Sequence, residues 1–409
     1  MDLKKMSTFI IFTCSIGLIF ELAYLRNSFY IPMCITLNLN NEEFGWLSSI
    51  YSISAAVTYL IGGFLSDRIH SRISLFLPLF FTGIIGIIFS TIPNYPVLKI
   101  LFFLMGITSI MTLFSFIVKV FYKFGDELGH GKVFGAMESG KGIIGGIIFL
   151  LMLALFNGLG GGEFGFKWII LAYSLINIIL GVSVILIVPD EYIYLKNEIK
   201  ISPLKQLLMV LKNKQILFLG GMVFVAYSFY GILSFFPMFF IENFDIAVNK
   251  MMLFASARYI IQILAPILAG FFADKINSSY KSMLLGLSLC FVIGILMLSS
   301  IGNKKLSSWI LFLYLILNFL VYGMKVYYYS CLSEIKIDKR FIGTAIGIVA
   351  CIGFSPDLFN YKMIGMWIDN GIAGYEKLME YMIGLSLFGI MIAIIAIKRK
   401  KERKLIKKF

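Results

Sequence analysis

Ionisable side chains stand inside long apolar segments of this sequence, where an unpaired charge is costly and therefore points to a function. The basic residues that could contact an anionic ligand are Arg26, Lys119, Arg258 and Lys325. The acidic residues that could carry a coupling proton are Glu21, Glu138 and Asp357, and Glu138 could also contact a ligand. This set predicts the binding of a charged solute, with or without proton exchange.

Several of these residues also have structural interpretations, which the sequence leaves open. Arg26 lies too deep in its segment to reach the headgroups easily, so it either faces a cavity or pairs with another helix. Lys119 is near enough to the end of its segment to extend to the membrane surface. Glu138 and Lys141 are one turn apart and could neutralise each other, and Arg258 could pair with an acidic residue.

Proton transfer through histidine is not expected, because His70 and His130 both lie in connections between apolar segments. Asp357 follows Pro356, which lacks a backbone N–H and should kink its helix. Asp357 could therefore carry a proton, cap the broken helix or pair with Lys362.

The composition places these charges in a membrane protein. Of 409 residues, 59% are hydrophobic and 14% are charged, which is more apolar than a soluble domain. The net charge of +14 comes from Lys and Arg gathered between apolar runs, so we expect a lipid bilayer and no nucleic acid as partner. The five scattered cysteines predict neither disulfides nor a metal site. We expect no cofactor and no enzyme activity, because no nucleotide loop or catalytic triad is present.

Twelve segments are long and apolar enough to span a bilayer as helices. They are 7–33, 44–66, 73–92, 97–122, 133–156, 166–188, 216–240, 249–272, 283–301, 307–332, 341–366 and 378–397. Most of the 36 Lys and Arg residues fall on one side if the N-terminus is cytoplasmic. The positive-inside rule therefore predicts a multi-pass, all-α protein of the cytoplasmic (inner) membrane with both termini in the cytoplasm.

The two halves of the chain repeat each other. The run Gly63–Arg68 recurs as Gly270–Lys275, 207 residues later, and Lys119–Tyr122 recurs as Lys325–Tyr328. Such duplication builds two bundles around a central site. The expected domains are a six-helix bundle (1–188), a cytoplasmic connection with a short amphipathic helix (189–215), a second bundle (216–397) and a basic tail (398–409).

The run from Gly63 through Asp67 and Arg68 to Arg72 resembles the loop motif of the major facilitator superfamily, with His70 at the place of a glycine. Together with the twelve segments and the repeat, the resemblance covers essentially the whole chain. It implies two pseudo-symmetric bundles of six helices, with the first, fourth, seventh and tenth helices around the substrate path. Lys119 and Lys325 lie on two of these helices.

Shorter runs resemble the organophosphate:phosphate antiporter family, which transports glycerol 3-phosphate and hexose 6-phosphate, and its bacterial relatives of unassigned substrate. They are Leu25–Met33, Ser66–Arg68, Phe149–Asn157, Tyr230–Leu233 with Pro237, and Gly343–Gly347. That family holds phosphate between two arginines. Arg26 matches the first, whereas Phe229 occupies the position of the second and Glu138 that of a histidine. These departures argue against a dianionic phosphate ester and favour an anion of lower charge.

We expect the repeated motifs to act in conformational gating. Asp67 and Asp274 each end a helix where the N-terminus of the eleventh or fifth segment offers unpaired N–H groups and a positive dipole. They should stabilise an outward-facing state, together with the other motif residues: Gly63, Arg68, Arg72, Gly270 and Lys275.

The sequence therefore predicts a monomeric secondary transporter that moves a small organic anion by alternating access. One alternative is a proton symporter of a neutral or zwitterionic solute, such as a sugar or an amino acid. Another is a membrane sensor that binds its ligand without transporting it.

Overall fold

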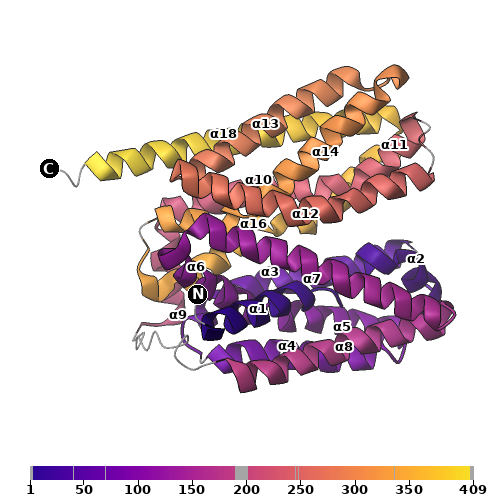
Figure 1. The fold of residues 1–409 in the computed structure, drawn as a ribbon, viewed down its shortest axis with the longest axis horizontal. Coiled ribbons are helices and arrows are strands. Elements are labelled where there is room, and N and C mark those ends of the chain that lie inside the picture. Colours follow the sequence, from indigo (N-terminus) through magenta and orange to yellow (C-terminus); the bar gives the residue numbers. More distant parts are fainter. Residues whose placement is uncertain are drawn as a thin grey trace. The chain divides into compact units, whose positions relative to one another are not determined.

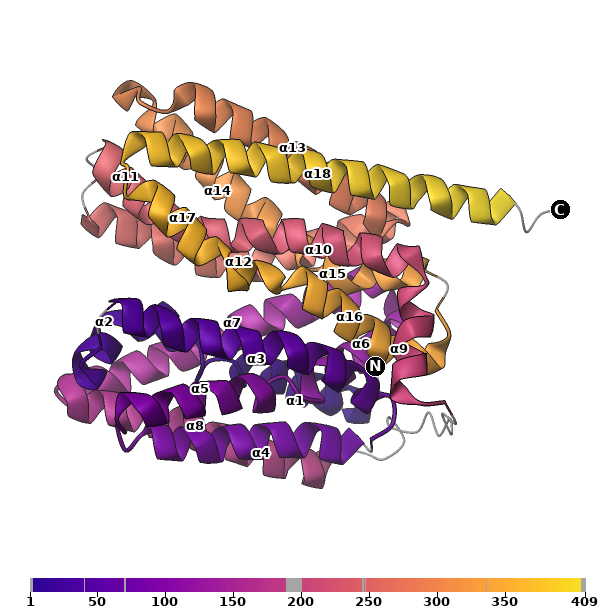
Figure 2. The same cartoon turned by 180° about the vertical axis from the view of Figure 1, so that it is seen from behind.

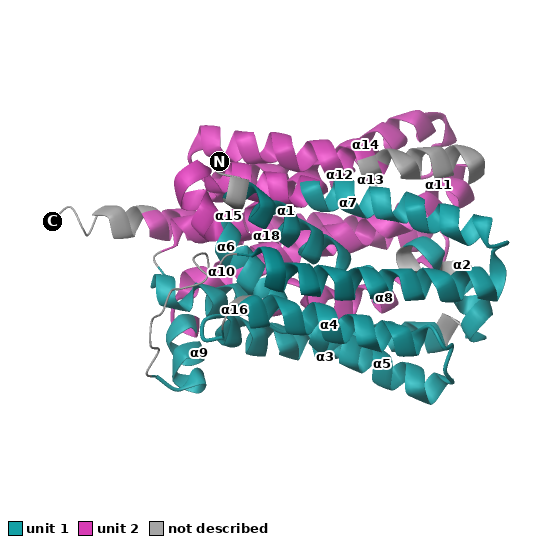
Figure 3. Ribbon diagram, turned by 60° about the horizontal axis from the view of Figure 1, so that its bottom comes forward, with its two compact units in different colours: residues 1–121, 140–210, 337–348 teal, residues 122–139, 211–336, 349–409 magenta. Residues whose placement is uncertain are grey.

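The computed structural model describes residues 3–39, 41–69, 71–188, 201–244, 246, 248–335 and 337–405. Every regular element within these ranges is a helix. The chain forms two compact units (Figure 3). Unit 1 comprises residues 1–121, 140–210 and 337–348, and unit 2 comprises residues 122–139, 211–336 and 349–409.

Unit 1 is a bundle in which α4 packs along α8 and α3 packs along α5 (Figures 1 and 2). Its helices are α1 (Leu3–Leu18), α2 (Arg26–Leu37), α3 (Asn41–Ser66), α4 (Ser71–Phe89), α5 (Tyr95–Thr108), most of α6 (Leu113–Leu128), most of α7 (His130–Gly158), α8 (Gly162–Ile187), α9 (Pro203–Leu211) and the first turns of α16 (Ile342–Gly353).

Unit 2 is a second bundle, in which α13 packs along α18 and α12 along α14 (Figures 1 and 2). Its helices are α10 (Lys214–Ile232), α11 (Phe236–Phe244), α12 (Val248–Ile276), α13 (Ser279–Ser300), α14 (Ser307–Met324), α15 (Tyr327–Ser330), α17 (Asn360–Ile368) and α18 (Ile372–Leu405). The start of α7 and the end of α16 also belong to this unit.

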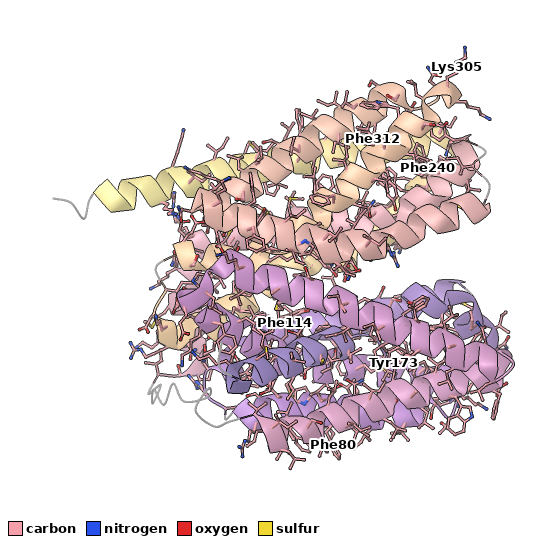
Figure 4. All side chains as sticks on the ribbon, in the orientation of Figure 1. Phe80, Phe114, Tyr173, Phe240, Lys305 and Phe312 are labelled. Carbon is pink, nitrogen blue, oxygen red and sulfur yellow. The ribbon has the colours of Figure 1, made fainter. Side chains whose placement is uncertain are left out.

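Helix α8 shows how the apolar sequence is used. Tyr173 and Asn177 are buried one turn apart, and Figure 4 shows Tyr173 inside its bundle. Leu175, Ile179 and Leu186 repeat at helical spacing on another face, where they are 45%, 62% and 77% exposed. An exposed apolar stripe of this length is unfavourable in water and favourable against lipid.

Ten helical stretches of the described chain are long and apolar enough to cross a bilayer, and a shorter apolar helix covers Lys5–Leu18. Helix α12, with 29 residues, occupies the eighth expected segment. These stretches are compatible with the twelve predicted segments, and the prediction of an all-α membrane fold is confirmed.

Several segments that we expected to be continuous helices are broken. In unit 1, the first segment is interrupted between α1 and α2, and the fourth between α5 and α6. In unit 2, α10 continues into α11 through a 3-10 turn at Leu233–Phe235, and α14 ends at Met324, with Lys325 as its C-cap, before α15 begins at Tyr327. The turn Ser355–Leu358, by contrast, separates α16 from α17 at the kink expected from Pro356, which cannot supply a helical N–H. Such breaks free backbone groups for ligands.

The two units cut across the two halves of the sequence. Residues 122–139, which include the start of the fifth expected segment, pack within unit 2, and residues 337–348, at the start of the eleventh, pack within unit 1. The sequence-based domain boundaries stay a prediction. Residues 189–200 of the expected connection and 406–409 of the expected tail lie outside the described residues.

Candidate functional site

The polar cluster of unit 1 surrounds Asp67, which follows the last residue of α3. Its carboxylate accepts hydrogen bonds from the backbone N–H groups of Gly343 (3.0 Å) and Thr344 (2.9 Å) and from the Thr344 hydroxyl (2.9 Å). These N–H groups belong to the first turn of α16, where they lack helical partners and form the positive end of the helix dipole. Asp67 therefore caps α16 with a fully buried carboxylate.

The Asp67 carboxylate also forms an ion pair with Lys119 of α6, with 2.9 Å between Nζ and Oδ1. The ammonium group donates a second hydrogen bond to the carbonyl oxygen of Ser66, at 3.4 Å. Because only 13% of the Lys119 side chain is exposed, each charge needs the other to offset the cost of its desolvation. In this state, Lys119 lies against the end of α3.

A third element reaches the cluster through a residue that the sequence analysis missed. Gln206 of α9 is fully buried and donates from Nε2 to Asp67 (3.2 Å) and to the Thr344 hydroxyl (2.6 Å). Arg68 donates to the Gln206 side-chain oxygen (2.9 Å) and to the carbonyl oxygen of Ile201 (2.6 Å). The amphipathic pattern of residues 203–211 predicts a helix there, but it does not tell which polar side chain is buried.

Glycines allow α3 and α16 to approach closely. A Cβ on Gly63 would lie 2.9 Å from the carbonyl oxygen of Gly343 and 2.9 Å from the Cα of Gly347. A Cβ on Gly347 would lie 2.8 Å from the Cα of Gly63. Because all of these neighbours are backbone atoms, a larger residue would force the two helices apart.

Arg72 acts on a different helix end. Its guanidinium donates to the carbonyl oxygen of Val188 from Nε (3.2 Å) and Nη2 (3.1 Å). Val188 is the C-cap of α8, where carbonyl groups lack helical partners and a positive charge is favourable. His70, within the same loop motif, lies outside the described residues.

Unit 2 contains the repeat of the aspartate cap. Asp274, near the end of α12, accepts hydrogen bonds from the N–H groups of Gly131 and Lys132, both at 2.9 Å. These groups lie in the first turn of α7. A Cβ on Gly270 would meet the backbone of Gly131 inside van der Waals contact distance, so glycine also allows this approach. Lys275 is exposed.

The cationic centre of unit 2 is Lys325, at the break between α14 and α15. Its Nζ stands 3.5 Å from the ring centroid of Tyr230 and 5.1 Å from that of Tyr322. The two rings meet edge to face, with 5.8 Å between their centroids. Ring faces attract a cation, so the tyrosines from α10 and α14 hold the ammonium group in place.

A carboxylate lies on the same tyrosine cluster. Asp357, in the turn between α16 and α17, accepts a hydrogen bond of 2.8 Å from the hydroxyl of Tyr227. The Tyr227 ring contacts that of Tyr230, with 5.8 Å between centroids. The nearby Tyr328 is buried, and its hydroxyl has no hydrogen-bond partner among the described residues. Glu138 is close enough to Tyr328 for an electrostatic interaction.

The remaining ionisable residues that the sequence predicted for ligand binding or proton coupling are Arg258, Glu21 and Arg26. Arg258 of α12 interacts electrostatically with Tyr314 of α14. In unit 1, the Glu21 carboxylate lies 3.7 Å from where a Cβ on Gly145 would stand, so the glycine leaves it space. Arg26 begins α2, directly after the break in the first segment, and its side chain lies outside those that the structure describes.

Metal-binding chemistry has no visible site in the described part of the chain. No group of three His, Cys, Asp or Glu side chains is placed there to hold an ion. None of the five cysteines, all of which lie in the described part of the chain, forms a disulfide, and Cys290 and Cys331 are buried.

Membrane-length helices that break beside the charged residues Lys325 and Asp357 are typical of a polytopic membrane transporter. A family comparison gives the same class: residues 6–356 match the model of the Major Facilitator Superfamily. The chain belongs to this superfamily, and the general fold predicted from its loop motif is confirmed.

Three curated relatives match along most of their length. Inner membrane protein YihN of Escherichia coli (strain K12) is 26% identical, over 98% of this chain and 97% of the relative. Inner membrane protein YqcE of the same strain is 27% identical, over 98% and 96%. The uncharacterized protein MG294 homolog of Mycoplasma pneumoniae is 25% identical, over 90% and 86%. None of these names states a substrate.

A solved structure has a similar fold. It is a bacterial homologue of the iron transporter ferroportin, in an outward-facing state. The TM-score is 0.72 with 13% sequence identity, and the match covers 97% of this chain and 100% of the other. At this identity the likeness shows the fold alone.

Proposed function

We propose that the protein is a secondary transporter that carries a small organic anion across the cytoplasmic membrane by alternating access. The observation that carries this proposal is the position of Lys325, a cation at a helix break, standing over two tyrosine rings. A broken membrane helix supplies ligand-binding groups near the bilayer midplane. Intramembrane cations are the expected partners of an anionic cargo.

Arg26 is the second basic partner in this proposal. It lies at the break between α1 and α2, as Lys325 lies at the break between α14 and α15. Phe229, at the position where organophosphate transporters are understood to have their second arginine, is fully buried. A monoanion, such as a carboxylate or a sulfonate, therefore suits the site better than a dianionic phosphate ester. Arg258, Glu138 and Lys119 are further ligand contacts in other states of the cycle.

We also propose that Asp67 and Asp274 are gating residues. Each holds the first turn of a helix from the other sequence half, and each approach depends on glycine. These bonds stabilise one state, and rocking of the two sequence halves breaks them. The surplus of Lys and Arg in the connections supports both termini in the cytoplasm, and two relatives carry the name inner membrane protein. One chain supplies both halves, so a monomer is sufficient.

The test begins with a search for the anion. A ligand selective for the folded protein at one hundred times its Kd adds about 2.7 kcal/mol of apparent stability. Purified protein is therefore heated with carboxylates, sulfonates, phosphates and amino acids. Stabilising solutes are then assayed for uptake into proteoliposomes.

The variants Lys325→Gln and Arg26→Gln remove one charge each from the proposed site. Loss of a charge-assisted contact, about 1.5–3 kcal/mol, should weaken apparent affinity for the anion about tenfold to a hundredfold. Lys305→Gln, in an exposed turn, is the matched control. Unchanged uptake by both site variants would contradict the proposed anion site, and binding without any flux would favour a sensor.

A proton-coupled mode has one observation in its favour, the hydrogen bond from Tyr227 to Asp357. The Tyr227 ring contacts the Tyr230 ring, over which Lys325 stands. Glu138 and Glu21 are the other acidic residues that could carry the proton. Uptake driven by an imposed pH gradient without a counter-anion, and lost in Asp357→Asn, would support symport. Uptake that requires an anion inside the vesicle would support exchange.

A further inference from the structure

The connection between the two sequence halves carries one buried amide, Gln206, to which no role has been given so far. We propose that Gln206 is a positioning residue for the gating residue Asp67. Its hydrogen bonds to Asp67, Arg68 and Thr344, which we call the clasp, let α9 stabilise the conformation in which Asp67 caps α16. The proposal rests on the gating role proposed for Asp67. In this proposal, the connection between the two sequence halves contributes to the conformational cycle of the transporter.

Both the nitrogen and the oxygen of the Gln206 side-chain amide form hydrogen bonds within the cluster. One nitrogen donates to Asp67 and to the Thr344 hydroxyl, at 3.2 and 2.6 Å, and the oxygen accepts from Arg68 at 2.9 Å. The Thr344 hydroxyl in turn donates to Asp67 at 2.9 Å. Asp67, Thr344 and Gln206 thus form a closed ring of hydrogen bonds. A ring of this kind, buried away from water, is costly to leave half satisfied.

The clasp joins two elements that must separate. Asp67 and Arg68 follow α3, whereas Thr344 belongs to α16. When α16 leaves the end of α3, Gln206 must abandon either its contacts with Asp67 and Arg68 or its contact with Thr344. The buried amide then loses hydrogen bonds whichever side it follows. Gln206 therefore adds to the stability of this state and slows departure from it.

The local sequence fixes Gln206 in place. Ser202 caps the start of α9 by accepting from the N–H of Lys205 at 3.4 Å, and Pro203 occupies the first helical position. Gln206 and Val210, one turn apart, are the buried residues of the helix.

Hydrogen–deuterium exchange of the purified full chain tests the clasp without knowledge of the substrate. The readout is the peptide covering 337–348, which contains the amides of Gly343 and Thr344 that Asp67 protects. The variant is Gln206→Met, which keeps the volume and removes the hydrogen bonds. We expect exchange in this peptide to accelerate about tenfold, equal to about 1.4 kcal/mol. Lys205→Ala, an exposed neighbour on α9, should leave the rate unchanged.

A double-variant cycle separates the clasp from general packing. If Gln206 and Thr344 act through their shared hydrogen bond, Thr344→Val should add little to the effect of Gln206→Met. If the effects of the two substitutions simply add, the proposed ring of hydrogen bonds is refuted. An unchanged exchange rate of residues 337–348 in Gln206→Met would also refute it. Equal acceleration in peptides of α4 and α8 would also count against it, because it reports general unfolding.

The gate itself is tested in the same experiment by Asp67→Asn. Faster exchange in Asp67→Asn with an unchanged rate in Gln206→Met would refute the clasp and leave the gate standing. An unchanged rate in Asp67→Asn would refute the gate as well. Neither result depends on whether the cargo is an anion.

Discussion

Replacing Asp67 by Asn should be the most damaging single substitution at the end of α3. The change keeps the size of the side chain but leaves Lys119 without its anion, although only 13% of that lysine is exposed. Removing one partner of a buried ion pair costs about 3–5 kcal/mol. The N–H groups of Gly343 and Thr344 would also lose a charged acceptor. The equilibrium should shift away from this state more than a hundredfold, since each 1.4 kcal/mol is a factor of ten.

The repeat supplies a matched comparison. Asp274 is only half-buried and its described bonds come from two backbone N–H groups, so Asp274→Asn should cost about 1–2 kcal/mol. The assay is hydrogen–deuterium exchange of residues 337–348 for the first variant and of 130–139 for the second. The double variant Asp67→Asn with Lys119→Met removes the stranded cation and should recover part of the loss. Equal effects of the two aspartates, or no recovery in the double variant, would refute this reasoning.

Two further predictions concern the same region. Gly347→Ala should disfavour the approach of α3 and α16 by about 1–3 kcal/mol. The control is Gly384→Ala, which should have no such effect, because there is open space where its Cβ would stand. Equal thermal stability and equal hydrogen–deuterium exchange in the two variants would contradict this prediction. The hydrogen bond from Arg340 lowers the pKa of Asp338 below 3.8, so the stability it contributes is present above this value and lost as the pH falls through the lowered pKa. Exchange of residues 338–341, corrected for its intrinsic pH dependence, should therefore stay constant from pH 7 to 5 and accelerate only in stronger acid, and Asp338→Asn should remove this step.

The sequence predicted the helices well because the bilayer imposes a strong constraint on them. A run of about twenty apolar residues leaves the backbone no alternative to a helix, and α4 and α8 overlap most of the expected segments 73–92 and 166–188. The breaks were less predictable. Pro356 predicted the break between α16 and α17. Gly323, in the last turn of α14, is a weaker signal for the break at Lys325, because glycine is common inside membrane helices.

The polar clusters were predictable only in part. A repeated motif drew attention to Asp67 and Asp274, because two copies of one charge at equivalent places require a common cause. Gln206 had no repeat and no charge, so it resembled any polar residue on the solvent side of a surface helix. Its burial depends on contacts with Thr344, which is far away in sequence. Pattern within one helix cannot reveal such a contact.

The most informative difference lies between two residues that the repeat makes equivalent. Lys119 continues within α6 and pairs with Asp67, whereas Lys325 ends α14 and stands over Tyr230. The helix break explains the divergence, because a lysine within a continuous helix keeps the direction that takes it to its aspartate. At a break, the backbone turns and the side chain meets the tyrosines of its own unit. In our proposal, the same residue therefore stabilises a closed end in one half and contacts the cargo in the other.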